Sequence, residues 1–218
     1  VSSLGARDAA FAAPFRGFGS ARVLRSLPEG KILLAGGFDH VGGTAVANVA
    51  RLNANLTVDT TFNTGGTGPN SNVNAVVIQG DGRIVLGGAF TSYNATTRNR
   101  LVRLEADGML DPTFNSGNGP SATVNALVAL PGGRLYVGGN YANYNNVARS
   151  GVTRVNADGS LDSSFLASTS AFDVATLLLQ DDGKLLVGGT FGSIGGVTVN
   201  NLARLSTTGA LDAGFPSG

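Results

Sequence analysis

The sequence lacks residue types on which many catalytic and metal sites depend. In 218 residues it has no cysteine, no tryptophan, one methionine and one histidine. A Cys/His nucleophile pair and a metal cage of cysteines or several histidines are therefore excluded. A Ser-His-Asp triad would have to use His40, which lies in a variable stretch where we expect an ordinary exposed residue. A chain of this length buries enough surface to fold without a disulfide or a metal.

Charge and long apolar runs are also scarce. Charged residues make up 13% of the chain and the formal net charge is +1, which is too small for the electrostatic footprint of a nucleic-acid-binding surface. No stretch of about 20 apolar residues is present to span a bilayer. We therefore expect neither a nucleic-acid partner nor membrane insertion. The chain begins at Val1 and shows no signal peptide, so we interpret its ends as cut from a longer protein.

Glycine, by contrast, is abundant, with 33 residues, and its positions reveal a repeat. A glycine pair closely followed by an aromatic residue recurs four times, and the aromatic residues are 52, 51 and 50 positions apart. These aromatic residues are Phe38, Phe90, Tyr141 and Phe191. A period of about 51 residues predicts an architecture in which each unit packs against its neighbours.

Each unit is expected to begin with two buried strands joined by a tight hairpin. In the second unit, apolar runs at 73–78 and 84–86 are too short for helices and are separated by three turn residues that end in Gly82. A three-residue hairpin calls for a left-handed residue in last position, and all four copies have glycine there. This register places Ile78 opposite Ile84. We expect the cation after each loop to be solvated: Lys31, Arg83, Arg134 and Lys184.

A second hairpin connects a third strand, around 101–104 in the second unit, to a short fourth strand. Its loop carries glycine last in three units, and the same register places an arginine opposite an aspartate eight residues later. Opposite charges across antiparallel strands attract. In the first unit Leu56 replaces the glycine, and we expect that hairpin to differ locally. The four predicted structural pairs are Arg51 with Asp59, Arg103 with Asp111, Arg154 with Asp162, and Arg204 with Asp212.

Four antiparallel strands in about 51 residues, with a glycine pair at the end of the second strand, are typical of a propeller blade. The predicted fold is all-β, a β-propeller-like array of four blades, each a four-stranded antiparallel sheet. We assign residues 1–11 to the tail strand of a preceding repeat and 12–218 to a single domain. Its repeats are expected at about 12–62, 63–114, 115–165 and 166–215.

These motifs resemble the delta-60 repeat family, a propeller-like group found mainly in large bacterial secreted and surface proteins. The resemblance rests on residues 182–191 with 201–205, and on 156–165. The layout is also similar to kelch repeats, although phenylalanine takes the place of the tryptophan that closes a kelch blade. The resemblance covers nearly the whole chain. It implies a bacterial repeat module at the cell surface or outside the cell, and it implies no reaction and no catalytic residue.

The tail motif Asp-x-x-Phe occurs five times, although the first three strands occur four times, because Asp8 to Phe11 precedes the first unit. Four blades that close into a ring leave one tail without a place, whereas an open arc exposes two end faces that invite a neighbour. For this chain we favour the closed ring. The alternative is a homodimer of eight blades through open end units, and adjacent repeats or domains of the parent protein are the other expected partners.

Few residues remain for chemistry. Acids lie close together at 107–111 and 158–162, but they lack the alternation of a calcium loop. We therefore expect no cofactor, with calcium as an alternative, and the recurring acids should serve turns and ion pairs. Tyrosine and asparagine occur together after the glycine pair in units two and three, a combination that suits sugars or protein surfaces, although ordinary turns are the favoured interpretation of such loops. The candidate ligand-binding residues are Tyr93, Asn94, Tyr144, Asn145 and Asn146.

Two functions follow from these observations. The favoured one is a noncatalytic repeat module, without enzyme activity, that acts as a scaffold, a spacer or an adhesive protein-interaction surface. The alternative is a carbohydrate-binding propeller that uses the Tyr/Asn loops. Carbohydrate cleavage is the weaker form of this alternative, since it needs two acids about 5 to 10 Å apart and the spacing of the acids suggests no such pair.

Overall fold

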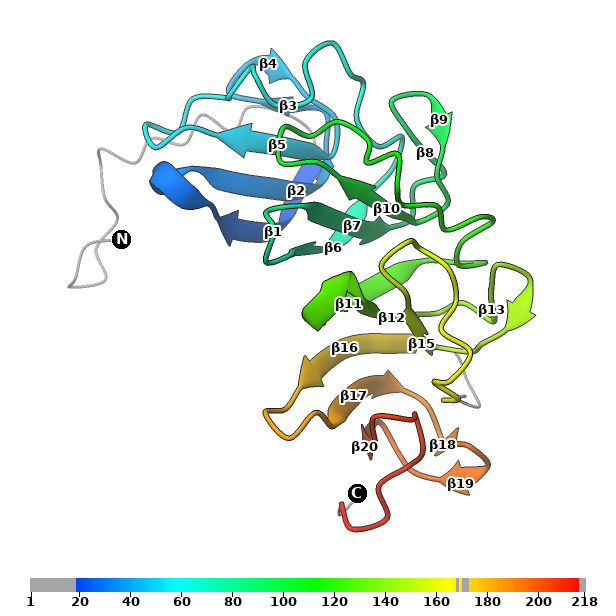
Figure 1. The fold of residues 1–218 in the computed structure, drawn as a ribbon. Helices are drawn as coiled ribbons and strands as arrows, with labels where there is room; N and C mark the ends of the chain where they lie inside the picture. The colour runs from blue at the N-terminus through cyan, green and yellow to red at the C-terminus, as the bar shows by residue number, and fades with distance from the viewer. Residues whose placement is uncertain (1–18, 168, 170–172, 216–218) are drawn as a thin grey trace, which may run out of the picture.

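The computed structural model describes residues 19–167, 169 and 173–215. It contains four successive three-stranded antiparallel sheets, one for each unit. Figure 1 shows the units in chain order along an open arc, from blue near the N-terminus to red near the C-terminus. The strands of units 1 and 2 are β1 (Gly19–Ser26), β2 (Ile32–Phe38), β5 (Val49–Leu52), β6 (Val73–Ile78), β7 (Ile84–Gly88) and β10 (Leu101–Leu104). Those of units 3 and 4 are β11 (Val124–Ala129), β12 (Leu135–Gly139), β15 (Val152–Val155), β16 (Asp173–Leu179), β17 (Leu185–Thr190) and β20 (Leu202–Leu205).

A short two-stranded hairpin lies between the second and third strands of each unit. The hairpins are β3 (His40–Val41) with β4 (Thr44–Ala45), β8 (Ser92–Tyr93) with β9 (Thr96–Thr97), β13 (Asn143–Tyr144) with β14 (Val147–Ala148), and β18 (Ser193–Ile194) with β19 (Val197–Thr198). The helical segments of the described residues are two 3-10 turns, η1 (Pro28–Gly30) and η2 (Pro131–Gly133). Within these residues the structure has no apolar helix of the length needed to cross a membrane.

The fourth strand of each blade is reduced to a single bridge. After the second hairpin of unit 2, Leu110 pairs with Leu104, and the chain then turns at Asp111. The amide of Phe114 donates to the Asp111 carbonyl, so the chain leaves the sheet edge after one bridge. The same bridge occurs in the other units, as Leu52 with Val58, Val155 with Leu161, and Leu205 with Leu211. The blades are therefore four-stranded with a minimal outer strand.

The register predicted for the first hairpin is confirmed. Ile78 lies opposite Ile84, and Leu179 lies opposite Leu185. In unit 2 the last loop residue, Gly82, has a φ of 86°, the left-handed conformation that the three-residue hairpin requires. The loops that begin with proline differ in one respect, because their middle residue is left-handed as well, with a φ of 59° at Glu29.

The expectation that the second hairpin of unit 1 differs locally is wrong for the backbone. Leu56 has a φ of 67°, and its amide donates to the Asn53 carbonyl at 2.8 Å. In unit 2 the Gly108 amide donates to the Glu105 carbonyl at 2.9 Å in the same way. The hydrogen bonds of the turn therefore hold the same backbone in both units, and leucine adopts a conformation that is costly for a residue with a side chain.

In units 2, 3 and 4 the second glycine of the pair is required by a bulge in the first strand, and Gly36, the first of its pair, takes this place in unit 1. In unit 3 the pairing of β11 with β12 shifts at Asn125, which brings the strands close together. A Cβ added at Gly139 would lie 2.1 Å from the Thr123 carbonyl oxygen. The equivalent distances are 2.1 Å for Gly88 to Asn72 and 1.9 Å for Gly189 to Asp173. Any side chain at this position would force the two strands apart.

In units 2 and 3 the first glycine of the pair is required by the next unit, whereas unit 1 has Ala35 at this position. A Cβ at Gly87 would lie 2.5 Å from a methyl group of Val124, and one at Gly138 would lie 2.8 Å from a methyl group of Val174. The first strand of each unit thus packs directly on the preceding sheet. Accordingly, one buried apolar cluster includes Val85 from unit 2 together with Val124 and Leu135 from unit 3. The core lies between neighbouring sheets, and each unit depends on its neighbours for burial.

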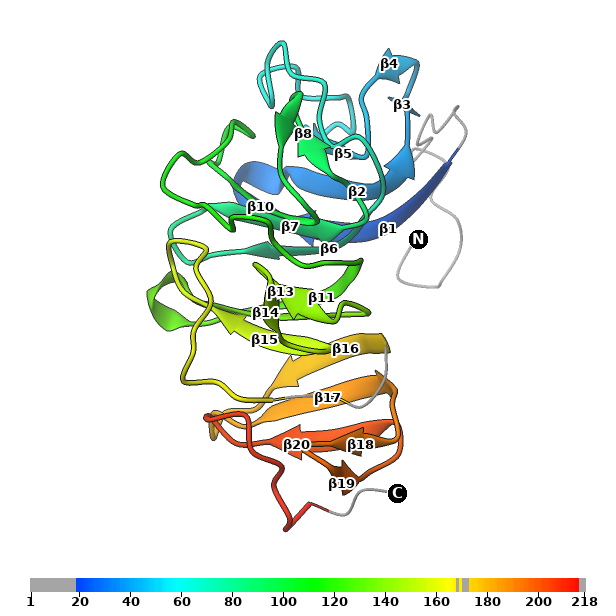
Figure 2. The same cartoon turned by 90° about the vertical axis from the view of Figure 1, so that its right-hand side faces the viewer.

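The four units do not close into a ring. Figures 1 and 2 show units 1 and 4 at opposite ends of the arc, with the four sheets stacked one on the next in the turned view. The expectation of a closed four-blade ring is therefore wrong. The first strand of each following sheet packs on the first two strands of the preceding one, and units 1 and 4 stay apart at the two ends of the arc (Figure 2). The additional tail, Asp8 to Phe11, lies outside the described residues.

We predict that Gly139→Ala lowers the free energy of unfolding by at least about 2 kcal/mol, because its Cβ would overlap a backbone carbonyl that cannot move alone. Urea denaturation followed by circular dichroism measures the change. Gly80→Ala is the matched control, because a Cβ there would meet no atom within 4 Å. Equal stability of the two variants would contradict the close approach at the bulge.

Candidate functional site

All four predicted arginine–aspartate pairs are present. In each pair the guanidinium Nε donates to Oδ2 of the aspartate. The distances are 2.7 Å for Arg51 and Asp59, 2.6 Å for Arg103 and Asp111, 2.6 Å for Arg154 and Asp162, and 2.8 Å for Arg204 and Asp212. The pair in unit 2 is buried, with the Asp111 side chain 0% exposed and the Arg103 side chain 4% exposed.

The other oxygen of each aspartate closes a turn. Oδ1 of Asp111 accepts hydrogen bonds from the amide of Thr113 at 2.7 Å and from its hydroxyl at 2.6 Å. Thr61 and Ser164 make the same two bonds in units 1 and 3, whereas Gly214 supplies only its amide in unit 4. A hydroxyl residue two positions after the aspartate is a recurring signal that the sequence reasoning missed.

The phenylalanine that ends the tail motif stacks on the same arginine. The guanidinium carbon of Arg103 lies 4.9 Å from the ring centroid of Phe114. In units 1, 3 and 4 the corresponding distances are 5.0 Å, 5.3 Å and 5.0 Å. All lie within the range of a cation–π interaction. The motif Asp-x-x-Phe therefore supplies both the carboxylate that binds the guanidinium and the ring that covers it.

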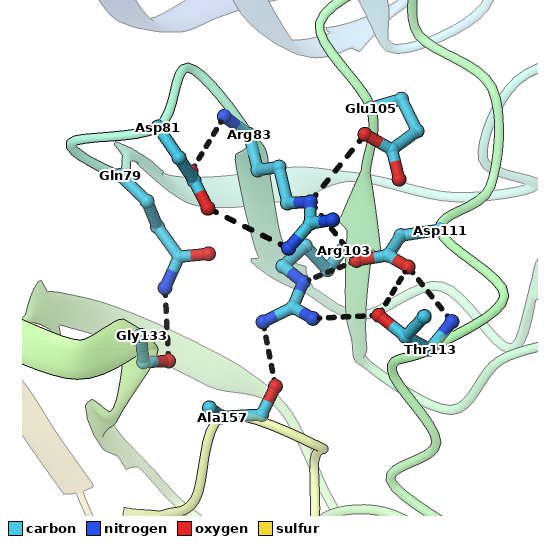
Figure 3. A network of polar contacts seen from close by, with 9 residues as sticks. All are labelled: Gln79, Asp81, Arg83, Arg103, Glu105, Asp111, Thr113, Gly133 and Ala157. Carbon is cyan, nitrogen blue, oxygen red and sulfur yellow. Dashed lines mark hydrogen bonds and ion pairs between the residues drawn. The ribbon is translucent and has the colours of Figure 1, made fainter.

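The arginine also binds the following unit, which the sequence reasoning did not foresee. Figure 3 shows Arg103 between Asp111 of its own unit and the Ala157 carbonyl in the second turn of unit 3. The distance from Nη1 to that carbonyl oxygen is 2.6 Å. Arg51 reaches Ala106 at 2.8 Å, and Arg154 reaches Thr207 at 2.6 Å. Each internal junction thus carries the same bridge from aspartate through arginine to the next turn.

The cations after the first hairpin are not all solvated as expected. Nζ of Lys31 lies 3.0 Å from Asp59, and Nζ of Lys184 lies 2.8 Å from Asp212. Arg83 lies 3.4 Å from Glu105 and 3.5 Å from Asp111. Of the four cations, only Arg134 is exposed and forms no such ion pair within the described residues. The strand register places Lys31, Arg83 and Lys184 near the aspartate that is paired with the arginine of the same unit. Their positive charges therefore help to neutralise that carboxylate.

These contacts keep the aspartates ionised. Burial by itself would raise the pKa of Asp162, but the Ser164 hydroxyl and the Arg154 guanidinium more than offset this and lower the pKa to about 2. For Asp212, the bond from Lys184 is the largest cause, and it also lowers the pKa to about 2. Burial likewise opposes the shifts of Asp59 and Asp111, yet the bonds from Thr61, Lys31, Thr113 and Arg103 leave both pKa values lowered.

The tyrosines of the candidate ligand loops are buried. Tyr93 and Tyr144 are each 0% exposed, and their hydroxyls donate to the carbonyls of Gly108 and Gly159 at 2.6 Å. A ring that stacks on a ligand must present a face to solvent, so the structure contradicts that role for both rings. Burial raises the pKa of both hydroxyls, which fits donors in an apolar site.

Two of the candidate asparagines, Asn94 and Asn145, accept hydrogen bonds from backbone amides. Oδ1 of Asn94 accepts from the Gly68 amide at 2.8 Å, and Oδ1 of Asn145 accepts from the Asn118 amide at 3.1 Å. Both asparagines are left-handed, as is the exposed Asn146. Their amide groups therefore attach the connecting segments between units to the short hairpins, and ligand binding by this set stays a hypothesis.

The recurring turn acids also act as predicted. Oδ1 of Asp107 accepts from the Met109 amide at 2.9 Å, and Oδ1 of Asp158 accepts from the Ser160 amide at 2.9 Å. Among the residues that the structure describes, no three His, Cys, Asp or Glu side chains are grouped as metal ligands would be. His40 is exposed and lies 3.1 Å from Asp39.

A polar row that the sequence reasoning missed runs across the first strands. Arg22 donates to Asn74, Nδ2 of Asn74 lies 3.3 Å from Oδ1 of Asn125, and Nδ2 of Asn125 donates to Asp173 at 2.6 Å. Three of these residues occupy the bulge of their strand, where the register shifts. The row links all four units on one side of the arc. Its spacing of 52, 51 and 48 residues is the signal that could have revealed it.

A cavity of about 460 Å³ lies in unit 1, between the β3–β4 hairpin and the connection to unit 2. Its lining includes the polar side chains of Asp39, Thr44, Asn63, Thr64 and Thr67. The hydrogen bond from His40 lowers the pKa of Asp39, which keeps this exposed carboxylate charged. The cavity therefore offers hydroxyl, amide and carboxylate groups to a polar ligand.

A family model described as "Domain of unknown function (DUF5122) beta-propeller" matches the chain four times, at residues 27–62, 79–114, 130–165 and 180–215. Each match spans the second and third strands and the Asp-x-x-Phe tail of one unit. The delta-60 assignment suggested by the motifs stays a prediction, since the matching model has a different name. No curated protein matches the chain.

Solved structures of propellers are similar to this chain in fold. The WD40 beta propeller domain of Doa1 has 17% identity and a TM-score of 0.54, over 85% of this chain and 50% of that one. The extracellular domain of BT4673 from B. thetaiotaomicron has 17% identity and a TM-score of 0.53, over 88% of this chain and 22% of that one. This chain thus spans half or less of either structure, and at this identity the likeness shows the fold alone.

We predict that Arg103→Met lowers the free energy of unfolding by about 3 kcal/mol or more, because it leaves the buried Asp111 without its main partner and breaks a junction bridge. Arg204→Met removes the equivalent residue of unit 4, where Lys184 still binds the aspartate. This matched variant should lose only about 1 kcal/mol. Thermal and urea denaturation measure both, and equal losses would contradict the bridging role.

We predict that the stability difference between the natural chain and Asp162→Asn is largest above about pH 4 and shrinks as the pH falls toward 2. A carboxylate whose pKa is lowered on folding stabilises the protein above its unfolded pKa and ceases to do so through its folded pKa. The shift from 3.8 to about 2 corresponds to about 2 kcal/mol. Urea midpoints at a series of pH values measure it, and a constant difference would refute it.

Proposed function

The chain belongs to the DUF5122 beta-propeller family, and on this basis we propose that it is a noncatalytic module of an extracellular bacterial protein. In this proposal the arc of blades acts as a rigid scaffold or spacer that holds neighbouring parts of the parent protein, or a protein partner, at a fixed distance. The proposal concerns the module, since the chain covers only part of the structures to which it is similar.

One observation carries the proposal: the same polar bridge crosses each of the three internal junctions. Arg51, Arg103 and Arg154 each bind an aspartate in one unit and a turn carbonyl in the next. At the same junctions the amide after the tail phenylalanine donates to that turn, as in Asn115 to Asp158 at 2.7 Å. Two directional bonds beside an apolar contact oppose both sliding and opening of the junction.

The noncatalytic part of the proposal rests on how the acids are used. Catalytic carboxylates need a free oxygen near the substrate and often a pKa near the working pH. Here Asp59, Asp111, Asp162 and Asp212 are ion-paired with lowered pKa values, and Asp107 and Asp158 cap turns. The recurring acids therefore support folding.

The extracellular and bacterial parts of the proposal have weaker support. The motifs resemble the delta-60 repeats of bacterial secreted and surface proteins, and one of the similar structures is an extracellular domain from B. thetaiotaomicron. An adhesive role at the cell surface is compatible with the same location. None of these similarities identifies a partner.

A second candidate function is carbohydrate binding, and the cavity of unit 1 favours it. Its hydroxyl, amide and carboxylate groups suit the hydroxyls of a sugar. This replaces the Tyr/Asn loops as the location, because Tyr93 and Tyr144 are buried. A glycan array with the isolated chain tests it: binding that is lost in Asp39→Ala would favour this function over a scaffold.

We predict that spin labels on units 1 and 4 of this 218-residue chain give a narrow distance distribution. Thr44→Cys and Val197→Cys occupy equivalent exposed positions in units 1 and 4, and the chain has no other cysteine to react. Pulsed electron paramagnetic resonance measures the distribution.

The matched control is a pair within one unit, Asp81→Cys and Thr96→Cys, both exposed in unit 2. A scaffold requires the distribution between the end units to be nearly as narrow as that within the unit. A broad distribution between units 1 and 4, with a narrow one within unit 2, would rule out a rigid spacer.

A further inference from the structure

The junctions of unit 2 with unit 3 and of unit 3 with unit 4 share one apolar packing arrangement. Two residues of the following first strand, three positions apart, cover the first glycine of the preceding unit. At Gly87 these are Val124 and Leu127, whose methyl groups would lie 2.5 Å and 3.2 Å from an added Cβ. At Gly138 they are Val174 and Leu177, at 2.8 Å and 3.1 Å. The first glycine of a pair is thus explained by a neighbour, not by its own sheet.

Unit 4 keeps this feature on its outer face, which no other unit covers within the described part of the chain. Gly188 is the first glycine of the last pair, and an added Cβ would meet only Thr176 and Asn201 of the same unit. On the same face Leu178 is 61% exposed. Its equivalents, Val77 and Val128, pack against the cores that include units 3 and 4 respectively. The apolar surface of unit 4 therefore matches the surfaces that units 2 and 3 present to a following sheet.

The outer face of unit 4 also carries polar side chains equivalent to those that form hydrogen bonds at the internal junctions. Arg204 binds Asp212 and stacks on Phe215 in the same geometry as the internal arginines. Its equivalents use their remaining nitrogen for the turn carbonyl of the next unit. Gln180 is the equivalent of Gln79, which donates to the Gly133 carbonyl of unit 3 at 2.9 Å. Arg204 and Gln180 thus repeat two donor groups of an internal junction, whereas Pro216 follows the tail phenylalanine and has no amide hydrogen for the bond that Asn115 donates at the junction of units 2 and 3.

The opposite end of the arc carries the matching apolar residue. Leu24 occupies the position of Leu127 and Leu177, two residues after the strand bulge. It is 60% exposed, because no sheet precedes unit 1 in the described residues. On apolar packing alone, unit 1 of a second copy would fit the outer face of unit 4.

Leu56 distinguishes unit 1 from units 2, 3 and 4, which have glycine at the same position of the second turn. In unit 2 the turn residue Gly108 lies so close to the tail of unit 1 that an added Cβ would be 2.8 Å from the Phe62 ring. At the equivalent Gly159 and Gly209 an added Cβ would lie 2.7 Å from backbone atoms of the preceding tail. Leu56 holds the same left-handed turn with a full side chain, so it would collide with an approaching tail.

We propose that the outer face of unit 4 is a docking surface for one further repeat whose second turn carries glycine, and that Leu56 prevents unit 1 of a second copy from occupying it. The recognised chemistry is a first strand with two apolar residues three positions apart, and a glycine turn with a free carbonyl that accepts a hydrogen bond from Arg204. The surface continues the three internal junctions. It goes beyond a scaffold role because it selects which repeats can be joined.

The test converts unit 1 into a repeat of the accepted kind. Leu56→Gly removes the obstructing side chain and suits the left-handed backbone, so this variant should fold at least as well as the natural chain. Sedimentation velocity over a range of concentrations should find the natural chain monomeric and Leu56→Gly associating end to end. Leu56→Ala retains a Cβ at the point of collision and is the matched control, which should stay monomeric.

A second change shows which faces associate. Adding Leu24→Arg or Leu178→Arg to Leu56→Gly should weaken association by at least about tenfold, since each places a charge in the apolar contact. Both positions are largely exposed in the monomer, so folding should be unaffected, and circular dichroism checks this. If the unmodified chain itself associates, and Leu24→Arg abolishes that association, then Leu56 does not obstruct docking and this part of the proposal is overturned. A monomeric Leu56→Gly, or association insensitive to both arginines, would overturn the docking surface.

Discussion

The close approach of neighbouring sheets is the constraint on which the rest of this structure depends. At Gly87 and Gly138 the next first strand lies so near that a single added methyl group would overlap it. This approach buries the apolar faces of both sheets and brings the following turn within reach of an arginine. A small blade of three strands and a bridge has little core of its own, so burial between units supplies what the single unit lacks.

The arginine bridge follows from this approach. Asp111 can hold Arg103 because the Thr113 hydroxyl and amide fix its other oxygen, and the Phe114 ring covers the guanidinium. One nitrogen is left, and it points to the next turn. A motif that looks like a local pair in sequence is therefore a connection between units. Its repetition at each junction gives the arc a regular geometry, which is what a scaffold needs.

Function in such a chain belongs where the units differ. The recurring residues are occupied by hairpins, ion pairs and junctions, whereas the cavity described above lies in unit 1, Leu56 replaces a turn glycine, and the face around Gly188 is exposed. Leu56 is instructive because leucine in a left-handed turn is costly. Its backbone is the same as that of the glycine turns, so its effect lies in what the side chain excludes.

The sequence alone determined the period, the all-β units, both hairpin registers and the four arginine–aspartate pairs. These depend on turn chemistry and on strand alternation, which act over a few residues. Sequence reasoning erred for Tyr93, because the carbonyl that binds its hydroxyl lies 15 residues away on another hairpin. It likewise missed the bond from Arg103 to Ala157, 54 residues along the chain. The open arc, the packing of the next unit on Gly87 and Gly138, and the bridging of units became visible only in the folded chain. These depend on how far one sheet turns relative to the next, and that angle is set by packing between side chains distant in sequence.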